Sequence, residues 1–153
     1  MGALPPKAVE AMIRKTRKSG KNIQLAALPY RIRKGKVQIM LITSRGTRQW
    51  IIPKGWPMEA LKPHKAAAQE AWEEAGIVGT IDKHCLGQYR YRKTRGPLYG
   101  QKIRVLVFAL QVEKCAKHFP EAGQRQRKWM SPQKAAKQIR MPELAEIVRD
   151  FAP

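Results

Sequence analysis

The sequence predicts a fold of the α/β class. More closely, it predicts an α+β mixed sheet that carries helices on its faces. Three observations lead to this prediction. Segments with the pattern of strands alternate with one central helix and two helices near the C-terminus. The run from Ile39 to Ile42 is almost continuously apolar, which is typical of a strand covered on both faces. A length of 153 residues fits one domain that buries about two-thirds of its unfolded surface.

The first residues, Met1 to Asn22, are predicted to form a basic arm in front of a single domain of residues 23–153. A run of Lys and Arg is most often a solvated, partly disordered segment. A short helix over Lys7 to Arg17 also fits, because Val9 and Ile13 fall on one helical face. Binding of nucleic acid is the functional alternative for this arm.

Strands are expected between the arm and the first Gly/Pro loop. The segment from Ile23 to Arg33 is rich in β-formers, and a turn at Lys34-Gly35-Lys36 leads to a second strand over residues 37–45. Residues 48–52 form the end of a further strand that enters the loop.

One helix follows this loop. It starts at Pro63, whose missing N–H is no loss at a first helical position, and it stops at Gly76. Alanines, which are strong helix formers, fill much of the interval. Glu70, Glu73 and Glu74 are spaced i, i+3, i+4, so their carboxylates share one face within an arc of roughly 100°.

The remaining elements are strands over residues 80–92, 101–112 and 126–130, a helix over residues 133–139 and a second helix from Pro142. The segment Lys93 to Gly100 contains glycine and proline and is expected to be a hairpin loop. Tyrosines alternate with basic residues around it. Such interleaving suits phosphate or nucleic-acid contact, or tyrosines that simply pack on the sheet.

Composition favours a phosphate-rich partner. The chain has 31 Lys and Arg against 11 Asp and Glu, a formal net charge of +20. Cys85 and Cys115 form no CxxC motif and no dense disulfide framework, as expected in a reducing cytosol. No apolar run approaches the roughly 20 residues of a membrane span. We therefore expect a cytoplasmic protein without a membrane partner and with nucleic acid as a secondary partner at most.

The acidic face of the central helix has two interpretations. A solvated acidic stripe is the usual one. In a chain this basic, however, three mutually repelling carboxylates gather without a basic i+4 partner, and a divalent cation would turn the repulsion into attraction. Mg²⁺ prefers carboxylate oxygens and shares its remaining positions with phosphates. A metal site is the sharper hypothesis.

The stretch from Gly55 to Ile77 resembles the signature of the Nudix hydrolases. That signature is Gly, five residues, Glu, seven residues, Arg-Glu, a hydrophobic residue, any residue, Glu-Glu, any residue, Gly and a hydrophobic residue. Its positions fall on Gly55, Glu70, Glu73, Glu74, Gly76 and Ile77.

The flanking stretches TSRGTRQWIIPKGW, EEAGIVGTI and QRQRKWM are similar to the diphosphoinositol polyphosphate phosphohydrolase subgroup, whose members also cleave diadenosine polyphosphates. The resemblance implies an α/β/α sandwich with a central loop-helix-loop metal site. It also implies Mg²⁺ or Mn²⁺ and hydrolysis of a phosphoanhydride bond in a polyphosphorylated small molecule, such as an inositol pyrophosphate or a dinucleoside polyphosphate.

By this resemblance Glu70, Glu73 and Glu74 are the catalytic metal ligands, and the backbone carbonyl of Gly55 adds a further ligand. Such a metal lowers the pKa of bound water and bridges phosphate oxygens. Lys and Arg must hold the rest of the substrate. The candidate phosphate-binding residues are Arg45, Arg48, Lys54, Arg90, Arg104 and Lys128.

Two residues depart from the signature. Leu61 stands at its first Glu, where it can neither bind metal nor move a proton, and Gln69 stands at its Arg, where it cannot form an ion pair. Three accounts are open: Glu59 replaces the missing acid, the remaining three acids suffice, or the protein binds phosphates without cleaving them. We prefer the second, because the metal ligands are intact.

The basic surface also fits a different class of function. An RNA-binding module, or a pyrophosphohydrolase acting on RNA 5′ ends, would use the same charge through salt-sensitive phosphate contacts. Turnover of small polyphosphates in the presence of Mg²⁺ discriminates between these classes.

Overall fold

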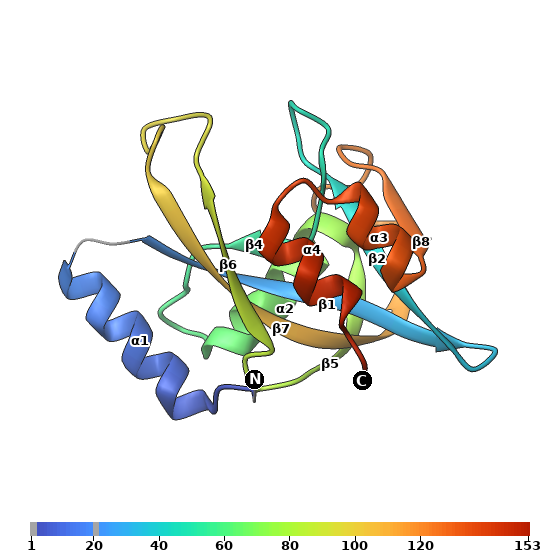
Figure 1. Ribbon diagram of the computed structural model, residues 1–153, viewed down its shortest axis with the longest axis horizontal. Coiled ribbons are helices and arrows are strands. Elements are labelled where there is room, and N and C mark those ends of the chain that lie inside the picture. Colours follow the sequence, from blue (N-terminus) through green and yellow to red (C-terminus); the bar gives the residue numbers. More distant parts are fainter. Residues whose placement is uncertain (1–2, 20–21) are drawn as a thin grey trace.

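The computed structural model describes residues 3–19 and 22–153 (Figure 1). Met1, Gly2, Gly20 and Lys21 belong to the predicted arm and lie outside the described residues. In chain order the elements are α1 (Pro6–Ser19), β1 (Asn22–Arg33), β2 (Lys36–Thr43), β3 (Trp50–Ile51), β4 (Lys54–Gly55), α2 (Pro63–Ala75), β5 (Ile77–Ile81), β6 (Gly87–Arg92), β7 (Lys102–Cys115), β8 (Arg127–Met130), α3 (Pro132–Gln138) and α4 (Pro142–Arg149).

The strands form one mixed sheet. Its main path runs β3-β2-β1-β7-β5, with β4 paired to β1, β6 to β7 and β8 to β2. The pair β1 and β7 is parallel from Asn22 opposite Ile103 to Tyr30 opposite Gln111, and the other pairs are antiparallel. The mixed sheet expected from the sequence is therefore confirmed.

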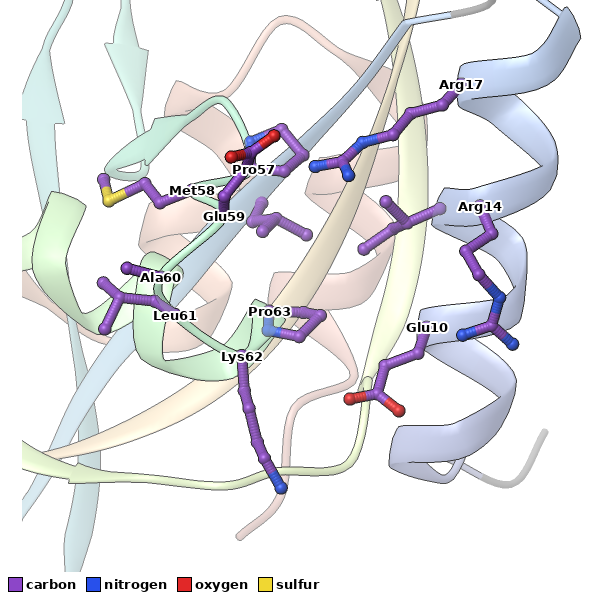
Figure 2. Close-up of a pocket in the computed structure, with 12 residues that line it drawn as sticks. Glu10, Arg14, Arg17, Pro57, Met58, Glu59, Ala60, Leu61, Lys62 and Pro63 are labelled. Carbon is purple, nitrogen blue, oxygen red and sulfur yellow. The ribbon is translucent and has the colours of Figure 1, made fainter.

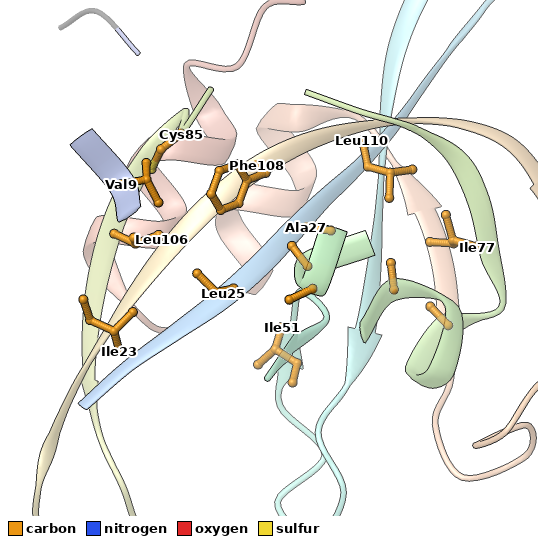
Figure 3. Packing of buried hydrophobic residues seen from close by; sticks show 14 of the residues in the cluster. Val9, Ile23, Leu25, Ala27, Ile51, Ile77, Cys85, Leu106, Phe108 and Leu110 are labelled. Atoms are coloured by element: carbon orange, nitrogen blue, oxygen red, sulfur yellow. The ribbon is translucent and has the colours of Figure 1, made fainter. Parts of the chain in front are cut away.

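Helices cover both faces of this sheet. On one face, Val9 of α1 and Ala67 of α2 pack in one cluster with Phe108, and part of this cluster is drawn in Figure 3. On the other face, Ala135 of α3 and Leu144 of α4 belong to a second cluster with strand residues. This is the expected α/β/α sandwich. The run from Ile39 to Ile42 is buried throughout, as its apolar character predicted.

One expected strand is divided in two. Residues 80–92 were predicted to be a continuous strand, but β5 ends at Ile81 and β6 begins at Gly87. The physical reason is the length of β7, which pairs with β6 along its first half and with β5 along its second. The chain must therefore leave β7 between these two strands and return to it. The sequence shows this only as a polar stretch around Asp82.

The basic N-terminal segment contains a docked helix. In α1, Val9 is 1% exposed and Ile13 is 7% exposed, so the apolar side faces the sheet while Arg14 and Arg17 are exposed. Leu4, just before the helix, exchanges two backbone hydrogen bonds with Cys85. Within residues 3–19 and 22–153, no helix is long and apolar enough to cross a membrane.

Candidate active site

The central helix α2 has the limits that its sequence predicts. Pro63 is its first residue, and Gly76 caps its end with a φ of 66°, in the left-handed region that favours glycine. The Gly76 N–H donates to the carbonyl oxygens of Ala71 and Trp72. A Cβ at Gly76 would lie 2.4 Å from a ring carbon of Phe119, so both the turn and the packing require glycine.

Small side chains bring α2 close to the sheet. Ala66, Ala67 and Ala71 are completely buried on its inner face. The backbone of β4 lies so near that a Cβ at Gly55 would be 2.2 Å from the carboxyl carbon of Glu70. Glycine at position 55 therefore leaves the space that the Glu70 carboxylate occupies. The backbone of Gly55 and the first acid of α2 are therefore in direct proximity.

Glu70 and Glu74 form a coupled pair. Glu74 is only 7% exposed, and its Oε1 accepts a hydrogen bond from the backbone N–H of Lys54 at 3.4 Å. Burial, the hydrogen bond with Glu74 and the charges of Glu74 and Glu73 together raise the pKa of Glu70 to about 8. Burial also raises the pKa of Glu74, against the lowering effects of Arg125, Glu70 and Lys54. Two carboxyl groups in this arrangement share a proton unless a cation takes its place.

Glu73 is oriented by the residue that departs from the signature. The Gln69 side-chain amide donates a hydrogen bond to Glu73 Oε1 at 3.3 Å. Gln69 thus supplies a neutral hydrogen-bond donor at the position where the signature has a charged arginine. The other departure, Leu61, is 38% exposed in the loop before α2, and Glu59 of the same loop lines a pocket beside α1.

A fourth carboxylate, missed in the sequence, belongs to the loop between β7 and β8. Glu121 donates its backbone N–H to the carbonyl of Glu73 at 3.0 Å, and its charge contributes to the raised pKa of Glu70. Arg125 lies 3.1 Å from Glu121 Oε1 and 3.9 Å from Glu74 Oε1. The Arg125 side chain is only 9% exposed. This loop has no periodicity, so the basic pattern QRQR was the only signal for Arg125, and nothing marked Glu121.

The donor set fits a hard divalent cation. It consists of carboxylates and a backbone carbonyl next to a loop, which are oxygen ligands of the kind that Mg²⁺ and Mn²⁺ accept. Within the part of the chain that the structure describes, no three His, Cys, Asp or Glu side chains have converged into a ready-made metal site. Instead, Glu70 is hydrogen-bonded to Glu74, which lies near Arg125. Metal binding would therefore have to displace the shared proton and move these side chains.

Of the predicted phosphate-binding residues, Lys54 and Arg45 lie at this site. Lys54 Nζ lies 5.0 Å from the ring centroid of Tyr91, and burial lowers the Lys54 pKa while Glu74 opposes the shift. Arg45 Nε lies 4.0 Å from Glu121 Oε1. Lys54 is the neighbour of Glu74, to which its backbone N–H donates, and Arg45 is the neighbour of Glu121.

The other four candidates lie in different surroundings. Arg90 forms an ion pair of 3.2 Å with Glu143 at the start of α4. Arg104 is opposite Arg90 in the β6–β7 pair and alternates with Ile103, which belongs to the α3 and α4 side of the sheet. The side chain of Arg104 is therefore on the face that carries α1 and α2.

Arg48 and Lys128 are also separate from the acids. Arg48 has a φ of 57° and lines a pocket of about 350 Å³ together with Lys137 and Arg140. Lys128 is exposed on β8 opposite Leu41, on the α3 and α4 side of the sheet. Substrate contact by Arg48, Lys128 or either of the preceding two arginines stays a prediction.

Comparison with known proteins gives the same family as the signature in the sequence. The family model described as NUDIX domain matches residues 23–151. Nudix hydrolase 4 of Arabidopsis thaliana is 27% identical over 145 residues, which are 82% of this chain and 68% of that protein. Diphosphoinositol polyphosphate phosphohydrolase 3-alpha of Mus musculus is 28% identical over 127 residues, covering 80% of this chain and 73% of that protein. The chain spans 60% and 59% of the length of Nudix hydrolases 13 and 12 of Arabidopsis thaliana.

Solved structures show the same fold. The Ap4A hydrolase of C. elegans, in a binary complex, superposes with a TM-score of 0.64 at 22% identity, covering 84% of this chain and 93% of that chain. The family model extends from Ile23 in β1 to Phe151, two residues after α4, and this match over most of the chain settles the classification. The chain belongs to the NUDIX domain family, the family of the Nudix hydrolases.

Proposed function

We propose that this protein is a metal-dependent pyrophosphohydrolase that cleaves a phosphoanhydride bond in a polyphosphorylated small molecule. The observation that carries the proposal is the hydrogen-bonded Glu70–Glu74 pair, in which the Glu70 carboxylate lies against the backbone of Gly55. Glu70, Glu73, Glu74 and the Gly55 carbonyl would hold Mg²⁺ or Mn²⁺. Such a cation supplies an activated water and neutralises phosphate charge.

Positioning and charge neutralisation do most of the work in this class of reaction. Lys54 and Arg45 provide positive charge beside the acids, and Arg125 holds Glu121 and Glu74 in place. Gln69 orients Glu73 through a hydrogen bond, without the ion pair that the signature arginine would provide. This supports the account in which the remaining three helical acids suffice.

The substrate class follows from relatives. The mouse relative is named as a diphosphoinositol polyphosphate phosphohydrolase, and the C. elegans structure is named as an Ap4A hydrolase. We propose that this chain takes an inositol pyrophosphate or a dinucleoside polyphosphate. Neither name includes a nucleic acid, so RNA is not part of the proposal. A cytoplasmic location and the division into an arm of residues 1–22 and a domain of residues 23–153 stay predictions.

A substrate panel tests the function. The purified protein with Mg²⁺ or Mn²⁺ is offered an inositol pyrophosphate, diadenosine polyphosphates, nucleoside triphosphates and 5′-triphosphorylated RNA, and released phosphate or nucleotide is measured. We expect cleavage of one of the first two classes and none after chelation. Absence of cleavage in the whole panel would overturn the proposal.

Glutamine variants test the site. We expect Glu73→Gln and Glu74→Gln to abolish metal-dependent turnover, because each removes a ligand charge that no neighbour replaces. Glu113→Gln is the matched control, since Glu113 is an exposed acid on β7 bonded to Thr80. Unchanged turnover in both α2 variants would show that the metal site is elsewhere.

Glu59→Gln tests the first account of the missing acid. Glu59 is exposed and lines the pocket on the α1 side, so we expect kcat to stay unchanged in this variant. A marked fall in kcat with normal folding would instead assign the missing acid's role to Glu59.

A further inference from the structure

A groove runs between α1 and the loop of residues 56–63, which connects β4 to α2. Two adjacent pockets of about 400 and 220 Å³ lie in it, and they share Ile13, Arg17 and Pro57 as wall residues. Figure 2 shows the larger one, with side chains of α1 on one side and the loop on the other. Its volume alone falls in the range of roughly 300–1,000 Å³ that is usual for small-molecule sites.

The inner walls of this groove are apolar. Ile13 of α1, Leu25 of β1 and Pro63 at the start of α2 line the larger pocket. Trp56 lines the smaller pocket and is 41% exposed, which leaves much of a large aromatic side chain open to solvent. A flat apolar ligand group could stack on this indole, a contact worth about 1–3 kcal/mol for a nucleobase.

The rim of the larger pocket carries five charged side chains. Three are cations and two are acids, namely Arg14, Arg17, Lys62, Glu10 and Glu59. In the described part of the chain, none of their side chains forms a hydrogen bond or an ion pair. In Figure 2 Arg17 is directed from α1 toward the loop, and Glu10 is directed toward Pro63. These donors and acceptors are therefore available to a ligand.

We propose that this groove is a nucleotide-binding site separate from the carboxylates of α2. An aromatic base would lie against Trp56, and a phosphate would meet Arg17, which lines both pockets. The acid Glu59, which lines the larger pocket together with Arg17, would accept hydrogen bonds from ribose hydroxyl groups. The groove depends on α1, which lies outside the matched family residues 23–151, so this site does not follow from family membership.

Binding can be measured without any turnover. The full-length protein is kept in EDTA and titrated with AMP, adenosine or ribose 5-phosphate, while the indole N–H signals of its four tryptophans are followed by NMR. Trp56→Phe assigns the Trp56 signal. We expect AMP to shift this signal in a saturable way, and each half-molecule to bind at least about tenfold more weakly than AMP. Because no cleavage is measured, failure of the proposed hydrolase function leaves this result interpretable.

Variants separate the two halves of the site. We expect Arg17→Ala to weaken AMP about tenfold and leave adenosine unchanged, because the arginine meets only the phosphate. Trp56→Ala should weaken both AMP and adenosine by about tenfold. Lys15→Ala, an exposed cation on α1 outside the groove lining, is the matched control and should bind like the unmodified protein.

Three results would overturn the proposal: a Trp56 signal unmoved by millimolar AMP, equal weakening by Arg17→Ala and Lys15→Ala, or unchanged AMP affinity in both groove variants. Lys54→Ala tests whether AMP binds at the carboxylate site instead of the groove, because Lys54 lies beside Glu74. If this variant alone abolished AMP binding, the nucleotide would belong to that site and the groove assignment would be wrong.

Discussion

Glu70 and Glu74 are residues whose buried carboxyl groups lower the stability of the fold when they are charged. Each carboxyl group is charged in the unfolded chain at neutral pH, but burial raises both pKa values in the folded state, and the contact with Glu74 adds to the upward shift of Glu70. The native protein therefore holds a proton that the unfolded chain releases. Active sites commonly carry strain of this kind, which a bound cation relieves.

The pH dependence of stability follows from this pair. The contribution of Glu70 to the free energy of unfolding is most favourable below its ordinary pKa of 4.5 and is lost as pH rises through its folded value of about 8. We expect Glu70→Gln to raise the melting temperature of the metal-free protein by several degrees at pH 9. At pH 4 it should change little.

Thermal unfolding in EDTA at both pH values checks this expectation. The control is again Glu113→Gln, whose carboxylate is exposed and should give no pH-dependent gain. Equal melting temperatures for Glu70→Gln and the unmodified protein at pH 9 would mean that the folded state tolerates the charged pair without cost.

At the scale of elements, patterns that repeat along the chain predicted the structure well. The limits of α2 followed from Pro63 and Gly76, and the hairpin loop from Lys93 to Gly100 lies between β6 and β7 as expected. The division between β5 and β6 did not follow, because it depends on which strand each pairs with. Strand pairing cannot be predicted from the local sequence, because it depends on residues that are distant along the chain.

The end of α2 depends on an arginine from a different element. Arg127 of β8 donates hydrogen bonds to the carbonyl oxygens of Ala75 and Ala116, at 2.8 and 3.0 Å. Its guanidinium also lies 4.9 Å from the ring centroid of Phe119. It therefore joins the helix C-terminus to the loop that carries Glu121.

We expect Arg127→Gln to lower the free energy of unfolding by about 1.5–3 kcal/mol, because two partly buried carbonyl groups lose a charged donor. Urea denaturation gives the measurement. Lys128→Gln, at the next position and exposed, should change stability by less than about 0.5 kcal/mol. A similar loss in both variants would contradict a specific role for Arg127.

For the whole molecule, tertiary structure decided which predicted site residues meet. Sequence spacing was enough for Glu70, Glu73 and Glu74, because they share one helix turn. Glu121 and Arg125 reach the same place only because the β7–β8 loop folds back on α2. Arg90 is paired with Glu143 at the start of α4, and its contact with phosphate stays a prediction. A cation's role depends on its partners, which no single sequence displays.

The net charge of +20 also acts on the whole molecule. Self-repulsion opposes the compact state, and salt screens it with a Debye length of about 10 Å at 0.1 M. We expect the melting temperature to rise between low and moderate NaCl concentration at neutral pH, in contrast to a protein stabilised mainly by surface ion pairs. A falling melting temperature in calorimetry over the same salt range would show that attractive charge pairs dominate.

The parallel pairing of β1 with β7 has a consequence for biosynthesis. Asn22 is opposite Ile103, so the partner of the first strand leaves the ribosome about 80 residues later. At about 5–20 residues per second, this delay lasts roughly 4–16 s. During that time the apolar residues of β1 have no lasting neighbour on that edge, and contacts so distant in sequence also form slowly. A nascent chain of this protein therefore exposes an apolar strand edge that chaperones can bind until β7 has been synthesised.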